Sequence, residues 1–195
     1  MRTTIKNKLY ISFSMCVLWM LLSCNGKVAQ DDDNMHSEHA NIVEIYLIDS
    51  LDEPRGFCLD IKGYKESADI KKGLQAHTCY SYQGNIAVDQ GFSLEQINIG
   101  EFYLPNFDVC MEANLADSDA SVKLEKCSKN AMQKFILNSN GSISLQDNQN
   151  LCLTISSERS QEGGGGNPPN LIRNLTLENC DLTQLNYQAW ATRKH

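Results

Sequence analysis

The chain has 195 residues and carries 24 acidic against 17 basic side chains, which gives a formal net charge of −7. Nucleic-acid binding depends on clustered lysine and arginine, so this balance argues against a nucleic-acid partner. The eight cysteines include no closely spaced Cys-x2–4-Cys pair, which argues against a zinc site.

Residues 1–23 have the pattern of an export signal. Basic side chains in residues 2–8 precede an apolar stretch over 9–22, which is too short for a good membrane span. The stretch ends in Leu-Leu-Ser-Cys at 21–24, which resembles a bacterial lipobox, so we predict that Cys24 is lipidated. An ordinary cleaved signal, with Cys24 incidental, is the alternative.

Residues 24–42 are predicted to form a disordered tether, because they are polar, lack periodicity and carry the acidic run 31–33. A lipid on Cys24 would anchor the protein in a bacterial cell envelope, at the outer membrane or the cell surface. With an ordinary signal the protein would be secreted. The lipid is the only membrane association that we expect.

Beyond the tether one phrase recurs three times: a cysteine in an apolar strand, a second cysteine, and then a Gln-x-aromatic triplet. Such a repeat dictates the whole fold. We predict that the aromatic side chains fill a shared core, and that the glutamines hydrogen-bond backbone groups near strand ends. The triplets contain Gln90 and Phe92, Gln133 and Phe135, and Gln188 and Trp190.

The six cysteines beyond Cys24 are predicted to form disulfides, because an even set is typical of exported domains. The repeat singles out one bridge within each copy. The predicted bridges are Cys58–Cys79, Cys110–Cys127 and Cys152–Cys180.

Short alternating segments predict an all-β body of about four strands per repeat, with no capped helix. The expected strands cover residues 43–48, 57–61, 109–113, 121–125, 134–137, 142–145, 151–155 and 174–178. Asn140-Gly141 predicts a turn. Residues 163–169, rich in glycine and proline, predict a flexible surface insertion that could reshape a neighbouring pocket.

The Cys-Leu-Asp, Leu-Gln-x-x-x-Cys and Gln-x-Trp pattern, in three copies, resembles the ricin-type (R-type) lectin family. The resemblance implies a β-trefoil over residues 43–195, with pseudo-three-fold symmetry and one disulfide in each repeat. The repeats would cover about 43–96, 97–140 and 141–195. The resemblance also implies a carbohydrate partner, a galactose- or N-acetylgalactosamine-like glycan.

The first repeat matches the family's sugar site most completely. By position, Asp60 would accept hydroxyl hydrogen bonds, His77 would take the place of the stacking aromatic, and Gln75 and Asp89 would assist. Gln90 completes the predicted set, and a nearby ring at Tyr64, Tyr80 or Tyr82 could add stacking area, with Tyr80 preferred. A carboxylate can accept hydrogen bonds from two hydroxyls at once. An aromatic ring that covers the C–H face of a sugar removes apolar surface from water, which favours binding.

The other two repeats depart from the family's pattern. Glu112 and Glu125 occupy the second repeat's carboxylate and aromatic positions. The third repeat has Thr154, Glu178 and Tyr187, and so loses the carboxylate. We therefore expect sugar binding mainly in the first repeat.

No catalytic set, metal cluster or phosphate loop is predicted, so we expect neither an enzyme nor a cofactor. The alternative to a lectin is a protein-interaction subunit on the same scaffold, similar to the lipidated receptor-binding subunits of cytolethal distending toxins, with sugar binding weak or lost. The identity of such a protein partner is not predicted.

Overall fold

The computed structural model describes residues 41–194. The predicted signal, Cys24 and residues 24–40 of the tether lie outside the described residues. The first strand begins at Ile42, one residue before the predicted start of the domain. In the part of the chain that is described, no helix is long and apolar enough to cross a membrane.

The described residues form fourteen strands and two one-turn helices, α1 (Leu94–Ile97) and α2 (Leu185–Gln188). The strands are β1 (Ile42–Leu47), β2 (Phe57–Ile61), β3 (Leu74–Thr78), β4 (Phe92–Ser93), β5 (Tyr103–Leu104), β6 (Val109–Ala113), β7 (Ala120–Glu125), β8 (Phe135–Leu137), β9 (Ile143–Leu145), β10 (Asn148–Ile155), β11 (Gln161–Glu162), β12 (Leu171–Arg173), β13 (Leu175–Asn179) and β14 (Trp190–Arg193).

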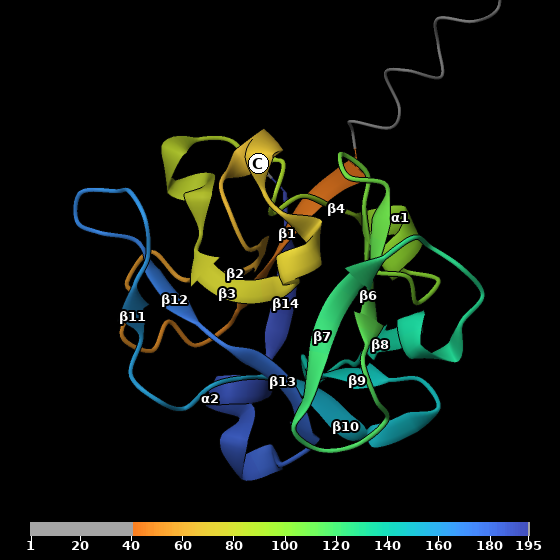
Figure 1. The fold of residues 1–195 in the computed structure, drawn as a ribbon. Coiled ribbons are helices and arrows are strands. Elements are labelled where there is room, and N and C mark those ends of the chain that lie inside the picture. Colours follow the sequence, from red (N-terminus) through yellow and green to blue (C-terminus); the bar gives the residue numbers. More distant parts are fainter. Residues whose placement is uncertain (1–40, 195) are drawn as a thin grey trace, which may run out of the picture. The chain divides into compact units, whose positions relative to one another are not determined.

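The strands pair in two seven-stranded antiparallel sheets (Figure 1). One sheet has the order β11-β12-β3-β2-β1-β14, with β4 paired to β1, and the other has the order β5-β6-β7-β13-β10-β9-β8. Strands β11 and β12 flank the glycine-rich segment 163–169 of the third repeat, and from here on the insertion means residues 161–173 together. The remaining strands number four in each repeat, which agrees with the predicted all-β fold.

The three repeats share one hairpin register, which shows their common architecture. Asp60 pairs with Gln75 across β2 and β3, Glu112 with Lys123 across β6 and β7, and Thr154 with Thr176 across β10 and β13. Each first cysteine lies two residues before the first member of its pair. The disulfides Cys58–Cys79, Cys110–Cys127 and Cys152–Cys180 are the three predicted bridges.

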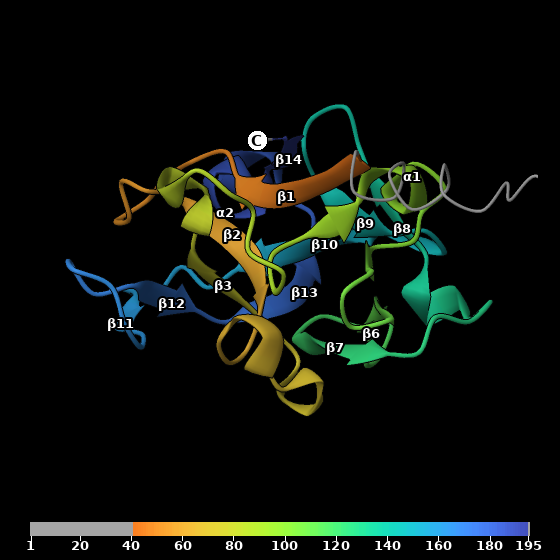
Figure 2. The same ribbon diagram turned by 90° about the horizontal axis from the view of Figure 1, so that it is seen from above.

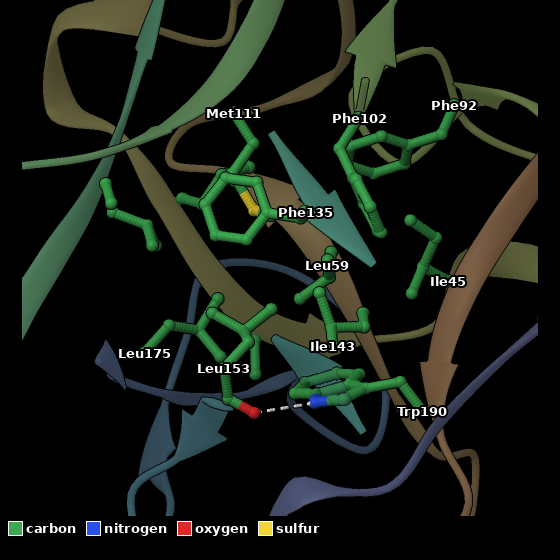
Figure 3. Packing of buried hydrophobic residues seen from close by; sticks show 14 of the residues in the cluster. Ile45, Leu59, Phe92, Phe102, Met111, Phe135, Ile143, Leu153, Leu175 and Trp190 are labelled. Atoms are coloured by element: carbon green, nitrogen blue, oxygen red, sulfur yellow. Dashed lines mark hydrogen bonds between the residues drawn. The ribbon is translucent and has the colours of Figure 1, made fainter. Parts of the chain in front are cut away.

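The aromatic residues of the triplets are buried in one hydrophobic core, as predicted. Phe92, Phe135 and Trp190 belong to the same cluster as Leu59 and Ile143 (Figure 3). The indole Nε1 of Trp190 donates to the backbone oxygen of Leu153 at 3.0 Å, so the one polar atom of this side chain is satisfied. The core therefore joins all three repeats.

The segments on either side of residues 163–169 form strands, one of which pairs with the first repeat, and the predicted flexibility of 163–169 itself stays a prediction. Strand β12 pairs with β3, with Ile172 opposite His77, and β11 pairs with β12. An edge strand presents unpaired N–H and C=O groups, and β12 satisfies those of β3. Figure 2 shows β11 and β12 beside β3. These segments of the third repeat, β11, β12 and the residues between them, thereby cover the edge of the first repeat's β2–β3 hairpin, and we call them the wall.

Arg55 holds the tip of the wall, at Pro168 and Pro169, through hydrogen bonds. Its guanidinium donates to the backbone oxygens of Pro168 at 3.1 Å and Pro169 at 2.7 Å. The same guanidinium pairs with Glu53 at 2.6 Å, and Glu53 is only 2% exposed. A buried carboxylate thus orients the arginine that holds the insertion.

Candidate functional site

One glutamine amide fixes the centre of the first repeat. Gln90 Nε2 donates to Asp60 Oδ2 at 2.9 Å and to the backbone oxygen of Thr78 at 3.1 Å, and its Oε1 accepts from the backbone N–H of Tyr80 at 3.0 Å. The amide thus ties the backbone at the end of β3, on both sides of Cys79, to the side chain of Asp60.

The same three hydrogen bonds recur in the other repeats, which confirms the predicted structural role of the triplet glutamines. Gln133 bonds the side chain of Glu112 at 2.7 Å, and Gln188 bonds that of Thr154 at 2.9 Å. Each also bonds one backbone oxygen and one backbone N–H beside its second cysteine. The repeats differ only in the side chain that receives the amide.

Asp60 is buried more deeply than its predicted role requires. The residue is 1% exposed, and its Oδ1 accepts from Gln75 Nε2 at 3.0 Å while Oδ2 accepts from Gln90. Burial, reinforced by the nearby Asp89 carboxylate, raises the pKa of Asp60 well above its usual range. In this geometry each oxygen of Asp60 accepts from one protein amide, and the expectation that Asp60 also captures hydroxyls stays a prediction.

Three further predicted site residues also lie beneath the surface. Asp89, Gln90 and Tyr80 are buried. Asp89 Oδ2 accepts from the backbone N–H of Lys65, and burial raises the pKa of this carboxyl. The Tyr80 ring lies against the imidazole of His77, with ring centroids 5.0 Å apart. These residues support the site from behind and do not line it.

An open hollow of about 420 Å³ lies over the first repeat, and two of the residues that line it, Gln75 and His77, are themselves only 8% and 3% exposed. Gln75 and His77 form its floor, and Tyr64, which is 60% exposed, stands at one side. The insertion closes the other side with Ile172 and the glycines 163–165. Two predicted site residues, Gln75 and His77, are therefore brought together here.

The turn that places Tyr64 depends on the glycine before it. Gly63 has a φ of 143°, and a Cβ there would lie 2.6 Å from the Cα of Ala68. Only glycine accommodates this fold-back of the chain. The turn brings the Tyr64 side chain to the edge of the hollow, and Lys65 Nζ lies over its ring, 5.3 Å from the centroid.

His77 presents a defined hydrogen-bonding atom to the hollow. Its Nδ1 lies 2.8 Å from the backbone oxygen of Thr78 and must donate to it. Burial lowers the pKa of His77, so the ring is neutral at pH 7 and Nε2 is an acceptor. A Cβ on Gly163 would lie 3.7 Å from Nε2, so this atom lies directly beside the insertion at the edge of the hollow.

The equivalent position of the second repeat is occupied by an ion pair. Lys123 Nζ lies 3.0 Å from Glu112 and 3.3 Å from Glu125. These carboxylates raise the pKa of Lys123, and hence keep it charged. An ammonium held by two carboxylates stands where the first repeat offers the amide of Gln75.

The third repeat has a wider hollow, of about 600 Å³, although the family's carboxylate is absent there. Thr154 donates to the backbone oxygen of Cys152 at 2.9 Å, and it accepts from Gln188. Glu178 accepts from Thr176 and Ser118, and Tyr187 also lines the hollow. The three residues that the sequence places at the third repeat's site, Thr154, Glu178 and Tyr187, all line this hollow.

Comparisons with known proteins support one reading of this architecture. A family model described as the ricin-type beta-trefoil lectin domain matches residues 49–165. No curated protein matches the chain.

Solved structures with the same fold are distant in sequence. The C-half of an earthworm R-type lectin, solved in complex with GalNAc, is 17% identical with a TM-score of 0.54, over 80% of this chain and 99% of that one. The mdaA-1 domain is 16% identical with a TM-score of 0.55, over 77% and 88%. The agglutinin of Abrus precatorius is 14% identical with a TM-score of 0.51, over 78% of this chain and only 46% of that longer chain. At such identities the likeness shows the β-trefoil fold alone.

Proposed function

The chain belongs to the ricin-type β-trefoil lectin domain family, and from this premise we propose that it binds carbohydrate in the hollow of the first repeat. The observation that carries the proposal is the convergence of Gln75, His77 and Tyr64 on one open hollow. These are an amide, a neutral imidazole and an exposed ring.

These groups can contact both the hydroxyls and the apolar C–H face of a sugar. The Gln75 amide oxygen and the His77 Nε2 accept hydrogen bonds from hydroxyls. The Tyr64 ring covers the apolar C–H face of the pyranose, and burial of that face favours binding. A galactose- or N-acetylgalactosamine-like glycan is the proposed ligand, since the earthworm lectin of the same fold was solved with GalNAc.

Asp60 acts in this proposal as a positioning residue. Its carboxylate accepts from Gln75 and so fixes the amide orientation, leaving the amide oxygen toward the ligand. Asp89, Gln90 and Tyr80 hold this arrangement in place from behind. The proposed role is therefore binding without catalysis.

We also propose that the protein is a lipoprotein anchored through Cys24 to a bacterial cell envelope. This part of the proposal rests on the sequence pattern of residues 1–24. One shallow hollow binds a single sugar weakly, and tethering many copies to one surface compensates through multivalency.

A glycan array with the full chain tests the proposal. We expect galactose-type glycans to bind, and Tyr64→Ala to weaken their binding about tenfold or more, as the loss of a stacking ring would. Tyr82→Ala is the matched control, because Tyr82 is a 50% exposed tyrosine of the same repeat outside the hollow. No glycan binding by the folded wild type, or equal loss in both variants, would contradict the proposed site.

A further inference from the structure

Two glutamine amides contact the buried carboxylate of Asp60, and the first of them, Gln90, is fixed in direction. Its Nε2 donates to Asp60 Oδ2 and also to the backbone oxygen of Thr78. Its Oε1 accepts from the backbone N–H of Tyr80. Because backbone groups fix both ends of this amide, Gln90 cannot turn round without losing two hydrogen bonds. The Oδ2 atom of Asp60 must therefore remain an acceptor.

The second amide, that of Gln75, is held by one contact only. Its Nε2 donates to Asp60 Oδ1 at 3.0 Å. Within residues 41–194 the Gln75 side chain makes no other hydrogen bond, and the residue lines the first-repeat hollow. The last torsion of a glutamine has two nearly equivalent settings that exchange the oxygen and the nitrogen. Gln75 can therefore present either its Oε1 or its Nε2 to the hollow.

The protonation state of Asp60 decides which way Gln75 turns. When the carboxylate is ionised, both oxygens accept, and Gln75 directs Nε2 toward Oδ1, as in the structure. A proton taken from solvent binds to Oδ1, because Oδ2 must keep accepting from Gln90. The new hydroxyl then meets the N–H of Gln75, donor against donor, and the hydrogen bond is restored only when Gln75 turns its Oε1 inward. Its Nε2 then faces the hollow.

The titratable groups around Asp60 favour uptake of this proton. Burial, and then the neighbouring carboxylate of Asp89, raises the pKa of Asp60 well above its usual range. On β3, burial lowers the pKa of His77, so no imidazolium stabilises the anion. In the segment after β3, burial raises the pKa of Tyr80, so this phenol stays protonated. The group most able to titrate against Asp60 is therefore Asp89.

The fixed charges on the surrounding elements are engaged elsewhere. On β12, Arg173 donates to Asp52 at 2.8 Å, and on β1 the buried Glu44 pairs with Arg193 of β14. In the turn after β2, Lys65 Nζ lies over a tyrosine ring. Within the described residues no cation forms an ion pair with Asp60. The charge of Asp60 is thus balanced by neutral amides alone.

The other repeats lack this arrangement. In the second, the residue opposite Glu112 is Lys123, which forms an ion pair with it at 3.0 Å and has no accepting end to turn. In the third, Thr154 lies opposite Thr176, and neither side chain ionises near neutral pH. A carboxylate that faces a turnable amide occurs in the first repeat alone among the three.

We propose that Gln75 determines the hydrogen-bonding specificity of the first-repeat hollow, and that one proton on Asp60 reverses its polarity. With Asp60 ionised, Oε1 of Gln75 selects a ligand group that donates, such as a hydroxyl. With Asp60 protonated, Nε2 selects a group that accepts. The ligand in this inference rests on the proposed function, whereas the turn of the amide is a property of the protein alone. Asp60 is a positioning residue in both states.

The turn is measured first, without ligand, by NMR of the full chain from about pH 4 to about pH 9. The measured quantity is the hydrogen-exchange rate of the Gln75 side-chain NH2 divided by that of Gln90. We expect this ratio to rise about tenfold as the pH falls through the folded-state pKa of Asp60, because the Gln75 NH2 then leaves the buried carboxylate for the hollow. The Gln90 NH2 stays inside in both states.

Asp60→Asn is the discriminating variant. Its amide oxygen must accept from Gln90, so its NH2 faces Gln75 and holds the latter with Oε1 inward at every pH. The exchange ratio should therefore be high throughout, without a transition, although His77 still titrates. Asp89→Asn should keep the transition and move it to lower pH, since it removes the neighbouring negative charge. These two variants separate Asp60 from the other groups that titrate nearby.

The effect on specificity is measured with galactose and its four analogues in which one hydroxyl, at C2, C3, C4 or C6, is replaced by fluorine. Fluorine cannot donate a hydrogen bond. Above the transition we expect one analogue to bind about tenfold more weakly than galactose, because Oε1 of Gln75 loses its donor. Below the transition, and in Asp60→Asn at every pH, this loss should disappear. Asp49→Asn, at an exposed aspartate of the same repeat outside the hollow, is the matched control and should behave as the wild type.

The outcomes separate the two proposals. A transition in the exchange ratio and in one fluorine penalty, present in the wild type and in Asp49→Asn but absent in Asp60→Asn, supports the inference. A constant ratio, a transition that survives in Asp60→Asn, or four penalties independent of pH overturns it and leaves the proposed function standing. Failure of galactose to bind the folded wild type overturns the proposed function for this sugar, and with it the role of Gln75 in specificity.

Discussion

The first and second repeats use the same backbone register and the same glutamine bonds, yet their surfaces differ. In the first, Asp60 is sealed beneath Gln75 and Gln90, and a neutral amide faces an open hollow. In the second, Glu112 keeps an ion pair with Lys123. The comparison teaches that the repeat fixes the framework, and that the residue opposite the carboxylate decides what the surface offers.

The largest difference in stability between the first and second repeats should appear when the triplet glutamines, Gln90 and Gln133, are replaced by alanine. Gln90→Ala leaves Asp60, Thr78 and Tyr80 with unsatisfied buried groups, and should lower the free energy of unfolding by about 3 kcal/mol or more. Gln133→Ala should cost about 1–2 kcal/mol, since two of its partners, Ser128 and Lys126, lie nearer to solvent. Urea unfolding measures both. Equal costs would contradict the deeper burial of the first network.

The wall on the first repeat provides the next comparison. Arg55→Ala leaves the buried Glu53 without its cation and should cost about 2 kcal/mol. It should also speed hydrogen exchange at the amides of Gly163 and Asn170. The pair Lys134–Glu101, whose side chains are 26% and 21% exposed, serves as the control, and Lys134→Ala should cost less than about 1 kcal/mol. Unchanged hydrogen exchange at these amides in Arg55→Ala would show that the wall keeps its structure without this arginine.

The burial of Asp60 predicts a dependence of stability on pH. Because the folded-state pKa is raised, Asp60 contributes stability below its usual pKa of about 4 and loses it as pH rises through the folded-state value. Relative to Asp60→Asn, which cannot ionise, the wild type should therefore lose stability as the pH rises above about 4 toward the folded-state pKa of Asp60. The slope cannot exceed about 1.4 kcal/mol per pH unit. Parallel curves for the two proteins would refute the buried carboxylate.

The smallest effect should come from Lys123→Gln, which gives the second repeat the amide of the first. The Lys123 side chain is 40% exposed, so its ion pairs are screened by solvent. The unfolding midpoint of Lys123→Gln should therefore shift less than those of the other variants. We expect no new glycan binding, because Glu125 stands where the first repeat has His77. A gain of binding on the array would show that the amide alone suffices.

Local sequence patterns predicted the strands and the disulfides well, because each β-hairpin and each disulfide forms within one repeat. The segments 57–61 and 109–113 match β2 and β6 to the residue, and the disulfide pairs follow from the repeat. Strand β3 was missed although Leu74–Thr78 alternates apolar and polar residues, because its first four residues include no β-branched side chain and no Phe, Tyr or Trp, and so give a weak strand signal. The β12–β3 pairing and the sealing of Asp60 arise between distant segments, which no local pattern reports.

The most direct test of the central claim is an NMR titration of the full chain with galactose. The account predicts shift changes at the side-chain amide of Gln75, the imidazole of His77 and the backbone of Gly163–Gly165, with no change around Lys123. Shifts confined to the second repeat, or a saturating ligand that leaves Gln75 and His77 unmoved, would contradict it.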